Sequence, residues 1–315
     1  MRKPVITVVG SFAVGMTLRT ARMPIFGETL LGSDFDMGPG GKGSNQAVAL
    51  ARLGAEAHFV GVIGNDKLGT IATELYKKEG VRTEHLEQTG EKATGAGFII
   101  LSPEGDNCII LDMGANELLD AASVDRAEEL IARSDLVMSV LEIPLEAAMR
   151  AMQLGKKHGV PTLLNPAPAR PLPSEIFGYV DLLTPNETEL RVLLGRSPDD
   201  DVPTRDLVDE LKSLGVSRVV ITMGEQGALI VERDGSEQAV SPVPVDVVDT
   251  TGAGDAFNAG LAVALAEGKS LEEATAFASC TGALACKTLG VIPSLAYRSD
   301  ADRLHQQVLH ERTLT

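Results

Sequence analysis

The sequence is short of positive charge, and this shortage limits the partners that the protein can have. It contains 28 Lys and Arg residues against 44 Asp and Glu residues, which gives a formal net charge of −16 at pH 7. A protein that binds nucleic acid through the phosphate backbone needs clustered basic side chains to displace counterions. We therefore expect no nucleic-acid partner, and any anionic ligand must meet local positive potential at helix N-termini or at a metal ion.

The sequence also has few cysteines and no long apolar run. Cys108, Cys280 and Cys286 cannot all pair within one chain, and none lies in a C-x-x-C spacing. No apolar run approaches the roughly 18 to 20 residues of a membrane span. The strand-like segment after Met1 breaks at Gly10, which is too soon for the apolar region of a signal peptide. We therefore expect a cytoplasmic protein that does not contact a membrane.

Hydrophobic residues, by contrast, make up 44% of the chain and occur along its whole length, without a repeat or a low-complexity tract. Beta-branched runs that predict strands alternate with apolar residues at helical spacing. The predicted strands are residues 5–9, 58–62, 136–140, 162–165, 181–184 and 218–222, and the predicted helices are residues 42–53, 68–78, 146–157, a segment from 188, and 204–214. This alternation predicts an α/β fold, a doubly wound and mostly parallel sheet with helices on both faces.

Two stretches interrupt the alternation. Residues 17–40 are rich in turn residues, and residues 96–113 read as two strands joined by a turn at 102–106. We expect them to form a small antiparallel sheet over one edge of the main sheet, although two unrelated surface hairpins would give the same pattern. The predicted lid segments are approximately residues 15–40 and 95–115, within one domain that spans residues 1–315.

The most informative motif is DTTGAGD, residues 249–255, which precedes an apolar helical stretch. Its glycines allow a tight turn in which the N–H groups of Gly252, Ala253 and Gly254 point together at the start of a helix. An acid just beyond such an anion hole can take a proton from an attacking hydroxyl while the N–H groups stabilise a transferring phosphoryl group. Asp255 fits this role, and the alternative is that Asp255 only caps the helix.

A second glycine-rich segment, GPGGKGSNQ at residues 38–46, opens a predicted helix. It matches neither the phosphate-binding P-loop, because Lys42 is followed by Gly43, nor the dinucleotide fingerprint. The remaining interpretation is that the backbone closely approaches a polyhydroxyl ligand, with Lys42 and Asn45 as hydrogen-bond donors. Alone, this segment is a weak signal.

Two polar segments follow predicted strands, where ligands bind in open α/β sheets. In NETE, residues 186–189, Asn186 is placed to face phosphate and Glu189 to organise water around a magnesium ion. The ordinary alternative is a helix cap at Asn186 or Thr188. The segment TMGEQG, residues 222–227, suits either a loop against a nucleotide or a tight turn.

Together these segments resemble the ribokinase-like carbohydrate kinases. The resemblance covers essentially the whole chain, in the order VVGS, PGGKGSNQAVALARLG, NPAPA, TPNETE, TMGEQGA and VDTTGAGDAFNAG. Each piece is modestly specific, and the ordered set is very specific. The resemblance implies a doubly wound α/β domain with a small β lid, ATP as the phosphoryl donor, magnesium, and a homodimer formed through the lids.

The resemblance also implies roles for single residues. Asp255 matches the catalytic base, and the glycine turn before it matches the anion hole. The positions that match the sugar site are Gly41, Lys42, Asn45, Glu142 and Asp255, and those that match the nucleotide site are Asn186, Thr222, Gly224, Gly227, Gly254 and, loosely, Ser279. In this family a loop beside the anion hole binds potassium, mostly through backbone oxygens. The positions that match this loop are Asp249, Thr251, Ala285, Thr288, Gly290 and Ser294.

The chain departs from the family pattern just after the first strand. Family members that bind ribose have Asn-x-Asp there, whereas this chain has Ala13 and Gly15 in the segment GSFAVG. Both side chains that would bond the sugar's hydroxyls are missing, so we expect ribose to be a poor or secondary substrate. The leading hypothesis is transfer of the γ-phosphoryl group of ATP to a primary hydroxyl of a small sugar. The alternatives are a deoxy or branched pentose, a ketose or a nucleoside as acceptor, or a non-catalytic sugar or nucleotide sensor.

Overall fold

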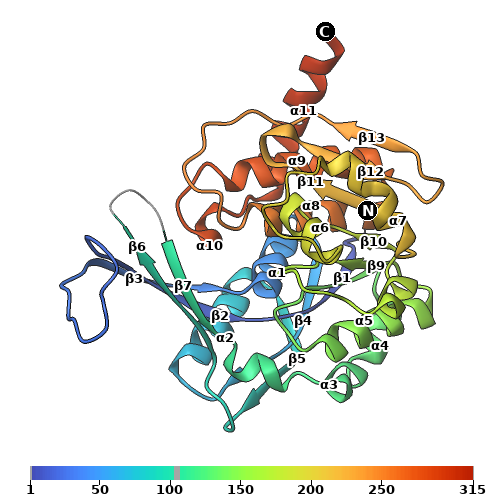
Figure 1. Cartoon of the computed structure of the whole chain (residues 1–315). Helices are drawn as coiled ribbons and strands as arrows, with labels where there is room; N and C mark the ends of the chain where they lie inside the picture. The colour runs from blue at the N-terminus through green and yellow to red at the C-terminus, as the bar shows by residue number, and fades with distance from the viewer. Residues whose placement is uncertain (1, 103–106, 315) are drawn as a thin grey trace.

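The computed structural model describes residues 2–102 and 107–314, and these residues form two sheets (Figure 1). Within this part of the chain the large sheet has nine strands, in the order β13-β12-β11-β10-β9-β8-β1-β4-β5. Its strands are β1 (Val5–Val9), β4 (Glu56–Gly64), β5 (Arg82–Thr89), β8 (Leu136–Ser139), β9 (Thr162–Leu164), β10 (Leu182–Leu183), β11 (Val219–Thr222), β12 (Ala228–Val231) and β13 (Glu237–Val240).

The strands from β5 to β11 in this order are parallel to their neighbours, and only β12 and β13 pair antiparallel at one edge. The predicted mostly parallel sheet is therefore confirmed. The sequence analysis did not predict β5, β12 or β13. Strand β5 (RTEHLEQT) lies at an edge and contains the charged residues Arg82, Glu84 and Glu87, and an edge strand tolerates such polarity because one side meets solvent.

Helices cover both faces of the large sheet, as predicted. One face carries α1 (Lys42–Arg52), α2 (Lys67–Glu79), α8 (Ala253–Ala266) and α9 (Leu271–Ala285). The other carries α3 (Ala121–Asp125), α4 (Glu128–Arg133), α5 (Leu145–His158), α6 (Glu187–Leu193) and α7 (Val208–Ser213). Successive residues of a strand point to opposite faces, so Val8 of β1 packs in the first core cluster and Val9 in the second.

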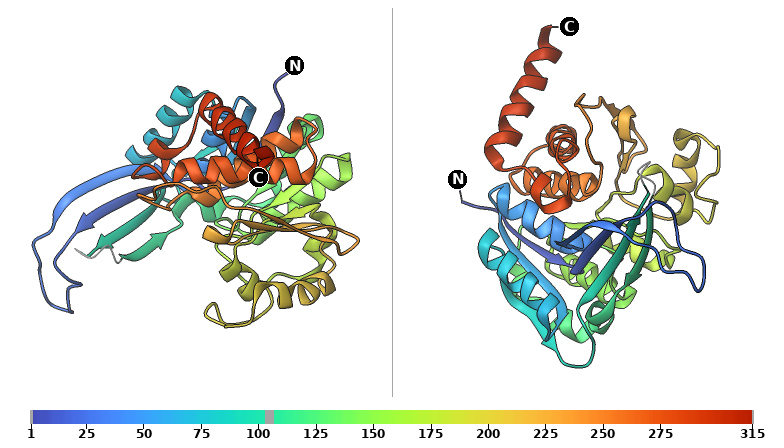
Figure 2. Two further views of the ribbon diagram at one scale, coloured as in Figure 1. Left: turned by 90° about the horizontal axis from the view of Figure 1, so that it is seen from above. Right: turned by 90° about the vertical axis from the view of Figure 1, so that its left-hand side faces the viewer.

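The remaining helices are short or lie at the end of the chain. Helix α10 (Val291–Ser294) follows α9, and α11 (Arg298–Leu314) projects from the body of the protein (Figure 2). Short 3₁₀ segments are η1 (Gly114–Leu118), η2 (Ser174–Tyr179), η3 (Thr204–Leu207) and η4 (Gly224–Gln226), so the helix predicted at 204–214 begins as η3 and continues as α7. No helix among residues 2–102 and 107–314 is long and apolar enough to cross a membrane.

The small sheet contains β2 (Ala13–Arg19), β3 (Ser33–Gly40), β6 (Gly95–Leu101) and β7 (Asn107–Asp112), and it stands out from the large sheet (Figures 1 and 2). Strands β2 and β3 pair antiparallel, as do β6 and β7, but β2 pairs parallel with β6. The expectation of an antiparallel sheet was therefore wrong, and so was the alternative of unrelated hairpins. Strand β2 follows β1, and strand β6 follows β5. Because β1 and β5 run in the same direction in the large sheet, β2 and β6 enter the small sheet in the same direction. The predicted turn at 102–106 falls largely on residues 103–106, outside the described residues.

Two buried contacts hold α1 in place. Arg52, the last residue of α1, forms an ion pair with Glu79 of α2, with 2.8 Å between Nη2 and Oε1, and both side chains are buried. The same guanidinium donates to the carbonyl oxygens of Ile292 (2.7 Å) and Leu295 (2.8 Å), in and after α10. Breaking a buried ion pair leaves an uncompensated charge and costs about 3 to 5 kcal/mol. Arg52 therefore fixes the position of α1 relative to α2 and α10.

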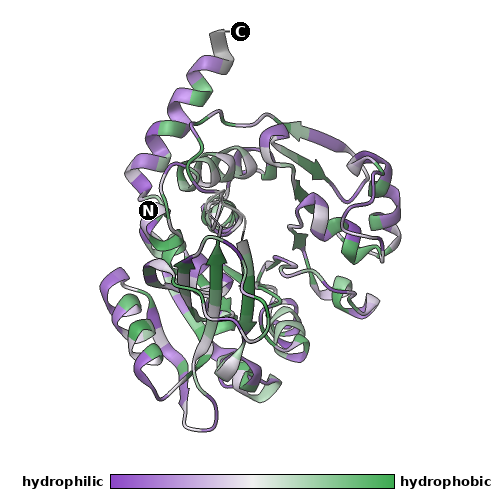
Figure 3. Cartoon of the chain, turned by 60° about the vertical axis from the view of Figure 1, so that its left-hand side comes forward, coloured by the Kyte–Doolittle hydropathy of each residue, from purple (hydrophilic) through white to green (hydrophobic). Residues whose placement is uncertain are grey.

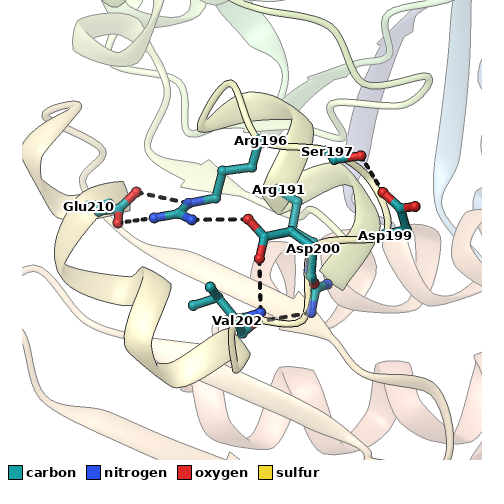
Figure 4. Close-up of polar contacts among 7 residues, drawn as sticks. All are labelled: Arg191, Arg196, Ser197, Asp199, Asp200, Val202 and Glu210. Atoms are coloured by element: carbon teal, nitrogen blue, oxygen red, sulfur yellow. Dashed lines mark hydrogen bonds and ion pairs between the residues drawn. The ribbon is translucent and has the colours of Figure 1, made fainter.

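A second polar cluster fixes the loop after α6 (Figure 4). Arg191 donates from Nε to the carbonyl oxygen of Asp200 at 2.7 Å and from Nη2 to that of Val202 at 3.2 Å. Arg196 joins the same loop to α7, through Asp200 at 3.0 Å and Glu210 at 2.5 Å. The cluster therefore orders the segment that connects α6, which carries the predicted Glu189, to α7.

Candidate active site

The polar residues that follow the central strands meet at one edge of the large sheet. Because these strands are parallel, their carboxyl ends lie at the same edge, where open α/β sheets bind ligands. Ser11 follows β1, Glu142 follows β8, Asn165 follows β9 and Thr184 follows β10, while Thr222 ends β11. Helices α1 and α8 contact each other on one face of the sheet and bring their N-terminal turns to this edge.

Asp255 lies in the first turn of α8, and its residue is only 6% exposed. Its Oδ2 accepts a hydrogen bond from Asn45 Nδ2 at 2.8 Å, and its Oδ1 accepts one from Gln46 Nε2 at 3.1 Å. Asp255 does not cap α8, because Gly252 is the N-cap residue and the carboxylate bonds to α1 instead. The carboxylate is thus held by two amides from a different helix.

The environment of Asp255 raises its pKa above the ordinary value of an aspartate. Burial is the largest cause, since it disfavours the charged form. The positive charge of Lys42 and the hydrogen bonds from Asn45 and Gln46 act in the opposite direction, and the nearby Glu142 raises the pKa further. A base with a raised pKa takes a proton more readily near neutral pH.

A series of buried amide and hydroxyl groups continues from Gln46 back to α8. Gln46 Nε2 also donates to Asn165 Oδ1 at 3.2 Å, and Asn165 Nδ2 donates to the carbonyl oxygen of Thr184 at 3.0 Å. Thr184 Oγ1 donates to Asn258 Oδ1 at 2.6 Å, and Asn258 Nδ2 donates to the carbonyl oxygen of Gly254 at 2.8 Å. This amide network therefore fixes both the carboxylate of the base and the peptide that precedes it.

The sequence analysis did not single out Gln46, Asn165, Thr184 or Asn258. Asn165 and Thr184 follow strands at the ligand-binding edge, which is the signal that would have found them. All four residues are nearly or fully buried, and a buried polar side chain needs a partner.

The glycine turn before Asp255 has the shape of an anion site. Gly252 has φ of 83°, and a Cβ there would lie 2.6 Å from Val291 Cγ1, so both the backbone and the space require glycine. The N–H of Ala253 donates to the carbonyl oxygen of Thr250 at 3.1 Å. Among the described residues, the N–H groups of Gly252, Gly254 and Asp255 have no acceptor. The available donors are therefore those three, at the positive end of a 14-residue helix.

Glu142 connects β8 to the start of α1. Its Oε2 accepts from Ser11 Oγ at 2.6 Å and from the backbone N–H of Lys42 at 2.8 Å, while its Oε1 has no hydrogen-bond partner among the described residues. Gly41, just before Lys42, has φ of 89°, and a Cβ there would lie 2.8 Å from the backbone nitrogen of Ala13. The predicted sugar residues Gly41, Lys42, Asn45 and Glu142 are thus brought together, and Ser11, which was not predicted, lies among them.

Lys42 lies among three carboxylates. Its burial lowers the pKa of the ammonium group, but the negative charges of Asp255, Glu142 and Glu189 outweigh burial and raise that pKa. Lys42 therefore stays protonated at neutral pH, and it carries positive charge next to the base.

Asn186 and Glu189 form a capping box at the start of α6. Asn186 Oδ1 accepts from the N–H of Glu189 at 2.7 Å, and Glu189 Oε2 accepts from the N–H of Asn186 at 2.8 Å. The helix-cap interpretation is therefore confirmed for Asn186, while Thr188 lies inside the helix. Burial raises the pKa of Glu189, with the charge of Asp255 acting in the same direction and Asn186 and Lys42 opposing both. Glu189 is thus close enough to Lys42 and Asp255 to belong to the same site.

The predicted nucleotide residues fall in two places. Thr222 bridges to Asn186 as a parallel neighbour, and the turn after it contains Gly224 (φ 54°) and Gly227 (φ 87°). Ser279, on α9, donates its hydroxyl to the carbonyl oxygen of Thr275 at 2.9 Å. The first three therefore lie together at the edge of the sheet, and the Ser279 hydroxyl is engaged by its own helix.

The predicted potassium loop is formed by two segments that Asp249 joins. Asp249 Oδ1 accepts from the N–H and the hydroxyl of Thr251, at 2.9 and 2.7 Å, and Oδ2 accepts from the N–H of Gly290 at 3.0 Å. Partial burial opposes these hydrogen bonds, but together they hold the pKa of Asp249 below its usual value. The predicted positions in the second segment are Ala285 at the end of α9, Thr288 and Gly290 in the following loop, and Ser294 in α10.

Comparison with known proteins identifies the family. A match to the pfkB family of carbohydrate kinases covers residues 3–297. The ribokinase of Bacillus subtilis is 39% identical over 300 residues, which cover 95% of this chain and 98% of the relative. The deoxyribokinase of Salmonella typhi is 38% identical over 253 residues, 80% of this chain and 82% of the relative. The solved structure of Arabidopsis thaliana ribokinase complexed with ribose and ATP has a TM-score of 0.91 at 33% identity, covering 97% of this chain and 99% of that chain.

The chain therefore belongs to the pfkB family of carbohydrate kinases. It is an ATP-dependent sugar kinase of the ribokinase type, a phosphotransferase whose acceptor is a hydroxyl group.

Replacing Gln46 by Met should move the acid limb of the pH profile of kcat/KM to higher pH. Gln46 donates to the carboxylate of Asp255 and thereby lowers its pKa, so the pKa of Asp255 rises further without this donor. The pH dependence of kcat/KM reports on groups of the free enzyme. Gln306→Met, on the exposed side of α11, is the matched control and should leave the limb in place. An acid limb at the same pH in Gln46→Met and wild type would contradict this role.

Proposed function

We propose that the protein transfers the γ-phosphoryl group of ATP to a primary hydroxyl of a small sugar, with Asp255 as the general base. The observation that carries this proposal is the buried carboxylate of Asp255 next to a turn whose N–H groups at Gly252, Gly254 and Asp255 have no acceptor in the described part of the chain. A base and an anion site in adjacent positions are what phosphoryl transfer to a hydroxyl needs. The presence of both the base and the anion site argues against the alternative that the protein is a non-catalytic sugar or nucleotide sensor.

In the proposed reaction, Asp255 takes the proton of the hydroxyl as its oxygen attacks the γ-phosphorus. The bond from the γ-phosphorus to the bridging oxygen breaks, and ADP leaves with that electron pair. The free N–H groups of the turn stabilise the negative charge on the transferring group, helped by the positive end of α8. Lys42 adds positive charge that acts on the base and on the carboxylates of Glu142 and Glu189.

Magnesium is part of this proposal, with Glu189 as the residue that faces it. The charged form of Glu189 is disfavoured by burial and by Asp255, and a nearby divalent cation would relieve that cost. Among the described residues no group of three His, Cys, Asp or Glu side chains could hold a metal, which suits an ion bound mainly by ATP phosphates and water. When bound, the ion neutralises phosphate charge. Activity that survives complete chelation of magnesium would contradict this.

A potassium ion in the loop joined by Asp249 is also proposed. Both oxygens of Asp249 are used in holding Thr251 and Gly290, so the ion would be bound by backbone oxygens of the two segments. Its effect would reach the anion site through Gly252, which packs against Val291. Equal turnover in potassium and in a buffer with only a bulky organic cation would remove this proposal.

The small sheet is the proposed dimer interface and lid. Leu18, Phe35, Met37, Phe98 and Ile110 lie on one face and are 39 to 69% exposed, and Figure 3 colours much of this sheet as hydrophobic. A contiguous exposed apolar patch usually marks an interaction site, and the partner proposed is a second copy. Phe98→Asp should dissociate the dimer in sedimentation experiments, and a wild type that sediments as a monomer would contradict the interface.

Replacing Asp255 by Asn should lower turnover at least about a hundredfold, the usual lower scale of general-base catalysis, without unfolding the protein. Among the described residues, the amide oxygens of Asn45 and Gln46 have no hydrogen-bond partner. The side chain that faces the new amide nitrogen can therefore turn over and accept from it, while the other continues to donate to the amide oxygen. Turnover is measured by coupled ADP release with the best acceptor, and folding by thermal denaturation.

The matched control is Asp209→Asn, an exposed aspartate of α7 with one partner, Lys212. It should leave turnover unchanged. Near wild-type turnover in a folded Asp255→Asn protein would show that Asp255 is not the base.

The acceptor is proposed to be a pentose-like sugar for which Ala13 and Gly15 leave room. The relatives include a ribokinase and a deoxyribokinase, so both ribose and a deoxy sugar belong in the first screen. Gly15→Asp should raise kcat/KM for ribose about ten- to a hundredfold, because a hydrogen bond to a charged group is worth about 1.5 to 3 kcal/mol. A Cβ at Gly15 meets its nearest atom, Ile99 Cδ1, at an ordinary 3.4 Å, so the variant should fold.

The double variant Ala13→Asn with Gly15→Asp is assayed on ribose and on the best acceptor of the screen, because it supplies both missing side chains. We expect kcat/KM to rise for ribose and to fall for the best acceptor of the screen. Wild-type protein that already uses ribose best, with both variants merely impaired, would refute the expectation.

A further inference from the structure

Helix α10 is too short to hold its own position. It contains only the four residues Val291–Ser294, and an isolated helix shorter than about 12 to 15 residues is marginal in water. The last four carbonyl groups of any helix have no partner within the helix, so in α10 every carbonyl needs a partner from elsewhere. Other parts of the chain must therefore fix α10.

Arg52, at the end of α1 that is remote from Asp255, supplies contacts of this kind. Its Nη1 donates to the carbonyl oxygen of Ile292 at 2.7 Å and to that of Leu295 at 2.8 Å. Its Cζ lies 4.9 Å from the centre of the Tyr297 ring, a distance at which a cation is attracted to the face of the ring. Arg52 therefore holds the carbonyl end of α10.

The guanidinium group of Arg52 is bound on two sides at once. Nε and Nη2 face the carboxylate of Glu79, at 2.9 and 2.8 Å, while Nη1 faces the two carbonyl oxygens. Arginine carries five N–H donors in a rigid fork, whereas the ammonium group of lysine is a single point. A lysine at this position would pair with Glu79 and would not also bridge to α10.

The other end of α10 touches the anion turn, which is residues 252–255. The N–H of Gly290, just before α10, donates to Asp249 Oδ2 at 3.0 Å. The side chain of Val291, the first residue of α10, lies against Gly252, where a Cβ would be 2.6 Å from Val291 Cγ1. The position of Val291 therefore limits where the anion turn can lie.

Helix α1 thus acts on both partners of the proposed reaction. Near its start, Asn45 and Gln46 hold the carboxylate of Asp255 directly. At its end, Arg52 holds the anion turn indirectly, through α10. The base and the N–H donors must be aligned for the attacking oxygen to meet the phosphoryl group, and a misplacement of about 1 Å can cost about a hundredfold in rate.

We propose that Arg52 is a positioning residue for phosphoryl transfer, which acts through Val291 of α10 to keep the anion turn aligned with Asp255. This inference rests on the proposed function, because the base and the anion turn are those of the proposed reaction. It assigns a part in the transfer step to a side chain that is almost a full helix length away from the base.

Acceptor binding should not depend on Arg52, because the start of α1 is held separately. The N–H of Lys42 donates to Glu142 Oε2 at 2.8 Å, and the N–H of Ser44 donates to the carbonyl oxygen of Ser11 at 2.9 Å. Loss of the contacts to α10 should therefore slow the transfer step without weakening the binding of the acceptor.

The test uses two variants of this connection. Arg52→Lys keeps the positive charge beside Glu79 and loses the fork that reaches α10. Val291→Ala leaves Arg52 in place and shortens the side chain that lies against Gly252, so it breaks the same connection at its other end.

The matched control is Arg298→Lys. Arg298 also forms two ion pairs, with Glu267 and Asp302, and lies over an aromatic ring, that of Phe277. In the part of the chain that the structure describes, the hydrogen-bond partners of Arg298 do not include residues 290–295. The control therefore loses the same fork without touching α10.

Four quantities are measured for each protein. They are kcat with the best acceptor, the Kd of that acceptor without ATP by calorimetry, the melting temperature, and amide hydrogen exchange in peptides that cover residues 250–257 and 290–296. Hydrogen exchange reports local opening and does not need turnover.

Arg52→Lys should lower kcat at least about tenfold, and Val291→Ala at least about threefold, since both misplace the anion turn. In both variants the acceptor Kd should change less than about twofold, and both peptides should exchange faster than in wild type. Arg298→Lys should leave kcat, Kd and the exchange of these peptides unchanged, even where its melting temperature falls.

Equal kcat in Arg52→Lys and Arg298→Lys would overturn the role of Arg52 and leave the kinase function intact, and so would an acceptor Kd that weakens as much as kcat falls. If Arg52→Lys does not fold, Val291→Ala decides, and a wild-type kcat in that variant would overturn the role. Absence of turnover by wild type with every acceptor would instead count against the proposed function. Hydrogen exchange then decides, because unchanged exchange at residues 250–257 in the variants would overturn the role and faster exchange would support it.

Discussion

The active site depends on one carboxylate, that of Asp255, which is buried and has no direct ion pair with any residue that the structure describes. Asp255 is held by amide donors from Asn45 and Gln46, while Lys42 acts on it through its charge and is not hydrogen bonded to it. Burial disfavours the charged carboxylate, and the two amides and the lysine limit that cost. The balance leaves a base with a raised pKa at the start of α8, and the other features of the site serve to maintain this balance.

The fold supports Asp255 from several directions. The amide network runs through Asn165 and Thr184, which follow neighbouring parallel strands, and returns to the Gly254 carbonyl through Asn258. Because Gly254 supplies the carbonyl of the peptide whose N–H belongs to Asp255, the network also orients one donor of the anion site. Displacing any member would therefore affect both the base and the turn.

Much of this could be predicted from the sequence, because the signals were local. The alternating strands and helices followed from apolar periodicity, and the turn at Gly252 followed from two glycines before an acid and an apolar helix. The amide network could not be predicted, because its hydrogen bonds join residues that are far apart in the sequence. Gln46 and Asn165 are 119 positions apart, and Gln46 and Asp255 are 209 positions apart. The parallel pairing of β2 with β6 was missed because each hairpin alone suggests antiparallel pairing. Strands β12 and β13 were missed because no strand pattern was recognised in their sequences.

The raised pKa of Asp255 means that the folded protein binds a proton at this carboxylate more tightly than the unfolded chain does. The most direct test is the free energy of unfolding of wild type and Asp255→Asn, measured by denaturant titration across a range of pH. An unfolded aspartate has a pKa of about 3.9, and the folded pKa is raised. The stability of wild type relative to the variant should therefore be greatest below about pH 3.9, fall as pH rises through the folded pKa, and stay constant above it. A difference in unfolding free energy that is flat across this range, or that grows with pH, would contradict a raised pKa of Asp255 in the folded protein.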